Sequence, residues 1–126
     1  MSLENQLYLQ LEHGRVVIDL LPDLAPNHVE RIKQLSREGF YGNLTFHRVV
    51  EGCVAQTGDL TGTGFGGSGQ FLDAELSTES FVRGTVGMAR GSDLNSGDSQ
   101  FFICLADATL LTRLYTLWGK VSSGIK

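Results

Sequence analysis

One arginine among the residues able to do chemistry lies in an unexpected setting. Arg48 stands inside an apolar run within segment 45–59, whose composition is otherwise typical of paired strands. A guanidinium keeps its proton and donates hydrogen bonds in a rigid fork. Burying it without partners is very costly. Arg48 therefore either reaches solvent along its aliphatic stem at a strand edge or is held by partners in a site.

Other motifs predict no cofactor or metal. The pattern G-x-G-x-x-G occurs within 62–67, but a dinucleotide site needs a helix directly after it, and 68–79 has no helical apolar period. The three histidines lack the spacing of metal ligands. The two cysteines, Cys53 and Cys104, are far apart in the sequence, which predicts small buried side chains with free thiols rather than a disulfide.

Composition and charge exclude several classes of protein. The chain has 126 residues, 41% of them hydrophobic, which predicts one globular domain over 1–126. Fourteen acidic against ten basic residues give a net charge of −4, which argues against a general nucleic-acid binder. No apolar run approaches the ~18 residues of a membrane span. The start, 1–4, does not have the pattern of a signal peptide. We expect a cytoplasmic monomer.

The elements that must position Arg48 are mostly short strands. Alternating apolar residues predict a hairpin over 7–21, and apolar residues spaced three apart predict one helix over 26–38. Further strands are predicted at 45–50, 53–57, 85–90, 100–105 and 114–121. Sixteen glycines fit a fold with many tight turns. These elements predict a closed or nearly closed antiparallel barrel.

Several separated motifs resemble one family in both order and spacing. They are 46–50 (FHRVV), 56–59 (QTGD), 87–89 (GMA), 99–103 (SQFFI) and 118–121 (WGKV). Together they are similar to the cyclophilin-type peptidyl-prolyl cis-trans isomerases. The resemblance implies a mainly β fold, a closed antiparallel eight-stranded barrel with a capping helix. Family members usually continue past WGKV with a second helix and a closing strand, so either the sequence is incomplete at Lys126 or the barrel closes differently.

The resemblance also implies the residues of the site. Arg48 takes the position of the catalytic arginine, and Gln56 that of the glutamine that steadies it. The substrate-binding positions are an apolar pocket for the proline ring, the backbone that pairs with the peptide, and polar groups at the rim. They are Phe102, Val54, Cys53, Leu111 and Leu110 for the pocket, Ala89 and Arg90 for the backbone, and Gln100 and Tyr115 for the rim.

The parity of the strands tests this assignment. If Glu51-Gly52 were a two-residue turn, Arg48 would oppose Ala55, and Gln56 would lie on the other face of the sheet. We therefore predict a bulge at Gly52 or near Ala55. Alternation also separates the two phenylalanines at 101–102, and the resemblance gives Phe101 the core position.

This chain departs from the family at several pocket positions. Cys53 stands where most active relatives carry phenylalanine, and Val54 where methionine is common. Leu110 replaces an aromatic residue, Arg90 replaces an asparagine, and the loop before Ser99 is one residue longer than the commonest pattern. Replacing phenylalanine with cysteine removes apolar wall, which would weaken peptide binding by ~1–3 kcal/mol.

Three functions remain open at this point, and the third is that of a small barrel that binds some other ligand. The first is an isomerase that acts on X–Pro bonds in peptides and folding proteins. The second is a binding module or chaperone-like scaffold that recognises proline-containing segments with little catalysis. The expected partners are proline-containing peptides and unfolded or flexible protein segments, with weak cyclosporin binding, and neither nucleic acid nor membrane.

Overall fold

The computed structural model describes residues 5–11, 14–38, 48–50, 52–58, 67 and 69–124, and for 10, 11 and 48 the backbone alone. Seven strands lie in this part of the chain: β1 (Gln6–Leu11), β2 (Gly14–Leu20), β3 (Arg48–Val50), β4 (Val54–Thr57), β5 (Thr85–Met88), β6 (Phe101–Cys104) and β7 (Leu117–Ser123). The α-helix α1 (Pro26–Arg37) and the 3₁₀ helix η2 (Thr109–Leu111) lie in the same part.

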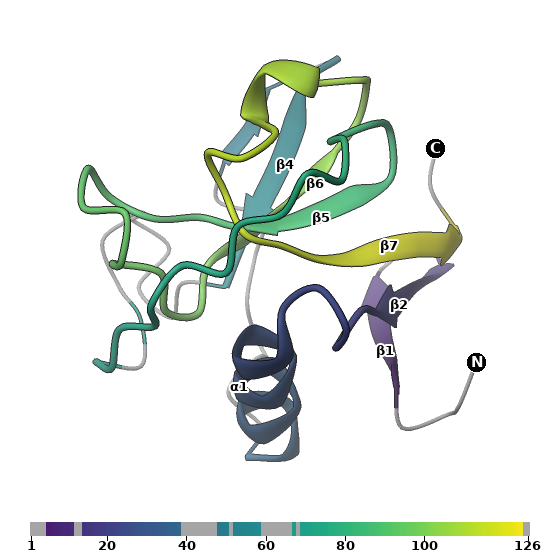
Figure 1. Ribbon diagram of the computed structural model, residues 1–126. Coiled ribbons are helices and arrows are strands. Elements are labelled where there is room, and N and C mark those ends of the chain that lie inside the picture. Colours follow the sequence, from purple (N-terminus) through teal and green to yellow (C-terminus); the bar gives the residue numbers. More distant parts are fainter. Residues whose placement is uncertain are drawn as a thin grey trace.

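The strands join in one antiparallel sheet that curls into a half-barrel (Figure 1). Their order is β1-β2-β7-β5-β6-β4-β3. The pairing of β1 with β2, from Gln6↔Asp19 to Leu11↔Gly14, confirms the predicted hairpin. In β2, Val16, Ile18 and Leu20 are buried and alternate with less buried residues, as expected for a strand with one face on a core.

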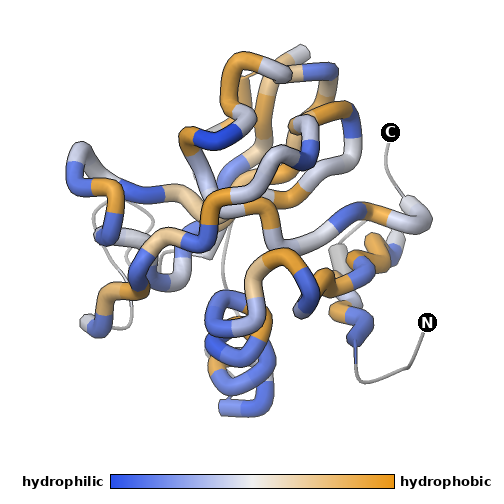
Figure 2. Tube along the Cα trace, viewed as in Figure 1, coloured by the Kyte–Doolittle hydropathy of each residue, from blue (hydrophilic) through white to orange (hydrophobic). Residues whose placement is uncertain are grey.

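The main core lies where α1 packs against the sheet. Val29 and Ile32 on the helix are buried in one cluster with Trp118 of β7 and Val86 of β5. Their spacing puts them on one side of the helix, which confirms the helix predicted at 26–38. Figure 2 shows mainly hydrophilic residues on the visible turns of α1, consistent with a helix that buries one face.

A distant carboxylate caps the start of α1. Ala25, at the cap position, makes no side-chain hydrogen bond to the first turn. Instead, the Glu75 carboxylate accepts hydrogen bonds from the backbone N–H of Asn27 at 3.1 Å and of His28 at 2.8 Å. These amides have no partner within the helix, and a negative charge is favourable at a helix N-terminus. The contact fixes the segment around Glu75 against α1.

Some expectations from the sequence need correction. The last strand was expected from 114 but begins at Leu117, because Arg113 has a φ of +69° and the Leu114 N–H closes a turn onto the Leu111 carbonyl at 3.0 Å. The described residues contain seven strands, with β1 and β3 at the edges of the sheet, rather than a closed barrel of eight.

The expectation for the glycine-rich segment was that no helix follows it. Residues 62–66 of the G-x-G-x-x-G pattern lie outside the described residues, and 69–80 contains no helix.

Within the part of the chain that the structure describes, no helix has both the length and the apolar character needed to span a membrane.

Candidate active site

Four strands place a row of residues side by side across the sheet. Arg48 on β3 is opposite Gln56 on β4. Gln56 is in turn opposite Phe102 on β6, and Phe102 is opposite Gly87 on β5. Directly opposite residues of antiparallel strands lie on the same face of a sheet. The row 48–56–102–87 therefore runs along one face.

The turn between β3 and β4 sets the register of this row. Three residues, 51–53, connect the two strands rather than two. Gly52 has a φ of +72°, in the left-handed region that favours glycine. The extra residue confirms the predicted irregularity at Gly52. It brings Gln56 opposite Arg48, where a two-residue turn would have brought Ala55.

The Phe102 ring lies between two other aromatic rings. Its centroid is 5.9 Å from that of Phe81, with the planes 24° apart, and 5.5 Å from that of Tyr115, with the planes 87° apart. Both arrangements are favourable for aromatic pairs. Beneath the ring is Gly87, where an added Cβ would be only 2.7 Å from the Phe102 Cζ atom. The absence of a side chain at 87 therefore makes room for the ring.

The neighbouring phenylalanine serves the opposite face. Phe101 is buried in the main core, with its ring centroid 5.3 Å from that of Trp118 and the planes 75° apart. The core position expected for Phe101 is confirmed. The alternation in β6 thus gives one phenylalanine to the core beside α1 and the other to the row that contains Gln56.

The structure brings together only some of the apolar residues expected at the pocket. Val54 is buried in a hydrophobic cluster that contains Phe102, and Leu111 packs against that cluster. The buried members of this Phe102 cluster are Val54, Phe81, Phe102, Cys104 and Leu117. Leu110 is 88% exposed, because successive side chains in a 3₁₀ helix point in different directions and Leu111 takes the inward one. The prediction of two buried thiols was wrong for Cys53, which the turn leaves exposed; Cys104 is buried, and both are free.

A hydrogen bond to Gln100 fixes the side chain of Gln56, the amide of the row. The Gln56 Nε2 atom donates to the Gln100 Oε1 atom at 2.9 Å. The Gln100 backbone carbonyl also accepts a hydrogen bond from the Ala89 N–H at 2.9 Å, so β6 and the end of β5 hold each other next to Gln56. Of the backbone predicted to pair with a peptide, the Ala89 amide is thus already used within the protein.

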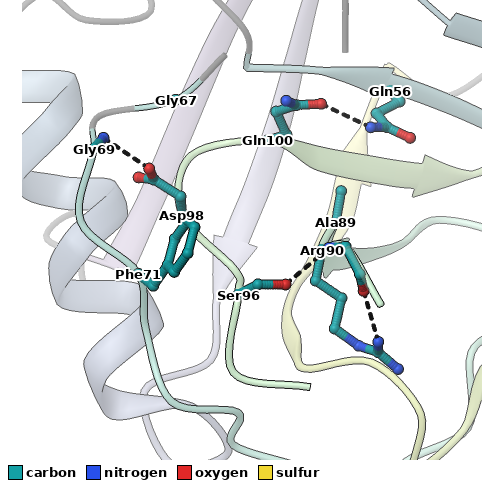
Figure 3. A pocket seen from close by; sticks show the side chains of 10 residues that line it. Gln56, Gly67, Gly69, Phe71, Ala89, Arg90, Ser96, Asp98 and Gln100 are labelled. Carbon is teal, nitrogen blue, oxygen red and sulfur yellow. Dashed lines mark hydrogen bonds between the residues drawn. The ribbon is translucent and has the colours of Figure 1, made fainter. Parts of the chain in front are cut away.

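Besides the apolar site around Phe102 there is a second pocket, with a volume of about 440 Å³, which Gln56 and Gln100 help to line (Figure 3). Six of its lining residues are Gln56, Ala89, Gln100, Phe71, Ser96 and Asp98. Sequence reasoning found the first three as site residues and missed the other three. The extra residue in the loop before Ser99 was a signal for two of them, since that loop supplies Ser96 and Asp98, and nothing in the sequence indicated Phe71.

Asp98 connects the wall of this pocket to α1. Its carboxylate lies 3.2 Å from the Nη1 atom of Arg31 and accepts a hydrogen bond from the Gly69 N–H at 2.9 Å. Arg31 also donates to the Gln70 carbonyl at 2.6 Å. At Gly67 an added Cβ would be 2.6 Å from the Asp98 carboxylate. Gly69 and Gln70 are therefore held by the loop that carries Asp98 and by α1.

A buried histidine and a partly buried carboxylate form an ionisable pair at the start of α1. The His28 Nδ1 atom is 2.6 Å from the Glu75 Oε1 atom. Burial lowers the pKa of His28 below its ordinary value and outweighs the opposite effect of Glu75. Burial alone would raise the pKa of Glu75, but hydrogen bonds from the His28 ring and from two helix amides lower it. A neutral His28 therefore donates to an ionised Glu75.

The pair also reaches the segment that carries Tyr115. The Glu75 N–H donates to the Thr116 hydroxyl at 2.9 Å, directly after Tyr115 in the chain. Among the residues that the structure describes, no three His, Cys, Asp or Glu side chains gather as they would around a metal ion.

Comparisons with known proteins identify the family. Residues 6–126 match the family described as "Cyclophilin type peptidyl-prolyl cis-trans isomerase/CLD". A protein of Brucella suis named "Probable peptidyl-prolyl cis-trans isomerase" is 49% identical, over 97% of this chain and 68% of its own length. A "Peptidyl-prolyl cis-trans isomerase" of Synechococcus elongatus is 38% identical, over 91% of this chain and 79% of its own.

A solved structure shows the same fold. The cyclophilin-type isomerase of Cryptosporidium parvum, crystallised in the presence of the dipeptide Ala-Pro, superposes with a TM-score of 0.89 at 31% identity. The match covers 94% of this chain and 79% of that one. The chain belongs to the cyclophilin-type peptidyl-prolyl cis-trans isomerase family.

Proposed function

We propose that this protein accelerates rotation about X–Pro peptide bonds in peptides and folding proteins. The observation that carries the proposal is the row in which Arg48, Gln56 and Phe102 follow one another across three paired strands. This row places an arginine, whose charge is permanent, on the same face of the sheet as an amide and an aromatic ring. An X–Pro substrate requires those three chemistries together.

The reaction needs neither a nucleophile nor a proton transfer. Amide resonance gives the C–N bond a rotation barrier of ~18–20 kcal/mol. In the twisted state the prolyl nitrogen becomes pyramidal and electron-rich, so a catalyst must bind that state better than either planar form. Arg48 supplies a donor that cannot lose its proton. Its role is to hydrogen-bond the twisted prolyl group.

The proline ring would occupy the apolar side of the row. Phe102 forms the floor, with Tyr115 edge-on beside it and Val54 and Leu111 in the same cluster. This proposal is supported by the Cryptosporidium relative, whose structure was determined in the presence of Ala-Pro. Because Ala89 uses its amide within the protein, peptide pairing along this edge would use the Ala89 carbonyl and the backbone of Arg90.

Preorganisation supplies the part of the rate that one arginine cannot. One charge-assisted hydrogen bond contributes ~1.5–3 kcal/mol, which is roughly tenfold to a hundredfold in rate. The rest must come from polar groups already oriented for the transition state. Gln56 is oriented by its hydrogen bond to Gln100, so the glutamine does not have to reorganise when the substrate arrives.

One observation favours a second function, a proline-binding module or scaffold with little catalysis. Leu110 and Cys53 are exposed rather than packed beside Phe102, so neither adds to the apolar wall. A shallower pocket binds short peptides weakly. For the same reason we expect weak cyclosporin binding.

The proposal includes one domain and a closed barrel. The edges of the described sheet are β1 and β3. An eighth strand between them would pair both edges and remove the exposed backbone groups that edge strands carry.

The test is isomerisation of a short X–Pro peptide by protease-coupled assay, with binding of the same peptide by calorimetry. Wild type should accelerate exchange, and Arg48→Ala should lose at least tenfold of kcat/KM while still binding the peptide. Arg15→Ala is the matched control, since it removes an arginine from the β1–β2 hairpin. If wild type binds the peptide without accelerating exchange, the result favours the scaffold. If wild type neither binds the peptide nor accelerates exchange, both functions are excluded.

A further inference from the structure

Arg90 is one of the residues that line the second pocket, and its guanidinium makes its hydrogen bonds elsewhere. Figure 3 shows the side chain extending away from Gln56 and Gln100. The Nε and Nη2 atoms both donate to the carbonyl of Leu114, at 3.1 and 2.8 Å. The Nη1 atom donates to the Gly91 carbonyl at 2.9 Å. The guanidinium is therefore committed to backbone acceptors on two separate segments.

The same guanidinium stacks on an aromatic ring of the proposed proline pocket. Its central carbon lies 4.7 Å from the centroid of the Tyr115 ring. Tyr115 in turn meets Phe102 edge-on, with centroids 5.5 Å apart. A planar guanidinium over a ring is an attractive arrangement. Tyr115 is thus held between Arg90 and Phe102.

The segment that Arg90 holds contains an unfavourable backbone conformation. Arg113 has a φ of +69°, and it is the one non-glycine residue in the described ranges with a positive φ. L residues with a Cβ rarely adopt this conformation, and it persists where the surrounding contacts enforce it. The double hydrogen bond from Arg90 ends on Leu114, the next residue. The contact is therefore placed where the segment needs to be held.

We infer that Arg90 is a positioning residue, whose guanidinium fixes Tyr115 and Leu111 as a preformed wall of the proline pocket. This inference rests on the proposed function. Leu111 belongs to it because the Leu114 N–H donates to the Leu111 carbonyl at 3.0 Å, so the clamp on Leu114 also fixes the end of η2. Arg90 acts on binding through these neighbours and does not touch the rotating bond.

A fixed wall has a defined kinetic consequence. If the wall is preformed, the substrate does not have to order it. The apparent Kd equals the intrinsic Kd divided by the fraction of molecules whose wall is already in place, so a larger fraction gives tighter binding. Losing the clamp should raise KM and leave kcat nearly unchanged. Lysine at 90 would keep the charge, but it cannot donate two hydrogen bonds in a rigid fork while stacking on the ring.

The experiment measures kcat and KM for an Ala-Pro-containing peptide, and the ring resonances of Tyr115 without peptide. Arg90→Ala and Arg90→Lys should both raise KM about threefold to tenfold, with kcat within twofold, and both should shift and broaden the Tyr115 ring signals. Arg15→Ala is the matched control, because Arg15 also stacks on a tyrosine, Tyr8, at 4.8 Å, on a different hairpin. It should change neither KM nor the Tyr115 signals.

Opposite results separate this inference from the proposed function. Wild-type KM and Tyr115 signals in Arg90→Ala would overturn it, and so would full rescue by lysine, which would make the role one of charge alone. A fall in kcat at constant KM would also overturn it. If wild type shows no isomerisation, the proposed function fails, and the Kd of the peptide together with the Tyr115 signals still tests Arg90. Arg90→Gln serves if Arg90→Ala does not fold.

Discussion

Gly87→Ala adds one methyl group beneath the aromatic rings of the site. A Cβ built at Gly87 would lie 2.7 Å from the Cζ of Phe102 and 2.7 Å from the Cε2 of Phe81. Carbon atoms in favourable contact are about 3.5–4.0 Å apart, so both rings must retreat by about 1 Å. Phe81 and Phe102 are both buried, and the Phe102 ring packs against the Tyr115 ring, so its displacement disturbs the proposed pocket.

The magnitude follows from two opposing effects. Overpacking a core costs about 1–3 kcal/mol, whereas replacing glycine by alanine at an unstrained position stabilises by about 0.4–1 kcal/mol through the unfolded chain. Gly87 is not among the described glycines with positive φ, so the second effect applies. We expect a net loss of about 1–2 kcal/mol in the free energy of unfolding. The corresponding fall in Tm is about 4–8 °C.

The assay combines thermal unfolding with isomerase kinetics. A Phe102 ring displaced toward the substrate should weaken peptide binding by about 1 kcal/mol, which is about fivefold in KM. Gly91→Ala is the control for stability, because the nearest atom to its added Cβ is the Ser96 Oγ at 3.5 Å, an ordinary contact. The reasoning is refuted if Gly87→Ala matches Gly91→Ala in Tm and matches wild type in KM.

Three further predictions concern the groups around the site. The folded-state pKa of His28 lies below 6.5 and that of Glu75 below 4.5, so the unfolded chain binds more protons in acid. Denaturant unfolding should therefore show stability that is complete above about pH 6.5 and decreases as the pH falls; a flat profile down to pH 4 contradicts this. Burial raises the pKa of Cys104 to about 11, so iodoacetamide at pH 8 should label Cys53 alone in the folded protein, as peptide mass mapping would show, and equal labelling of both would refute the burial. Asp98→Ala leaves the Gly69 amide without its carboxylate acceptor, which should cost about 1–3 kcal/mol and speed hydrogen exchange at Gly69; unchanged exchange would mean that Asp98 does not hold the segment.

Local patterns were sufficient for the hairpin and the helix, whereas the resemblance to the family supplied the residues of the row. Alternation predicted the β1–β2 hairpin, and the spacing of Val29, Ile32 and Leu35 predicted α1. The hairpin and the helix depend on residues a few positions apart, where backbone geometry restricts the outcome. A two-residue turn would have put Gln56 on the other face from Arg48, so the irregularity at Gly52 followed from combining strand parity with the resemblance.

Long-range contacts were not predictable from the same patterns. Glu75 caps α1 from 47 residues away, and Asp98 reaches Arg31 across 67. Nothing in the sequence around either carboxylate indicates its partner, because the fold alone brings them together. The second pocket was missed for this reason. The start of β7 was misplaced because the chain turns at Arg113, and the local pattern does not indicate this turn.

The most direct test of the central claim is NMR of an Ala-Pro-containing peptide mixed with the protein. One sample gives both the rate of cis/trans exchange and the proton contacts of the proline ring. If the row is the active site, exchange cross-peaks appear with wild type, the prolyl ring protons show contacts to the Phe102 ring, and Arg48→Ala slows the exchange at least tenfold but keeps those contacts. Unchanged exchange with Arg48→Ala, or prolyl contacts to a different surface, would contradict the account.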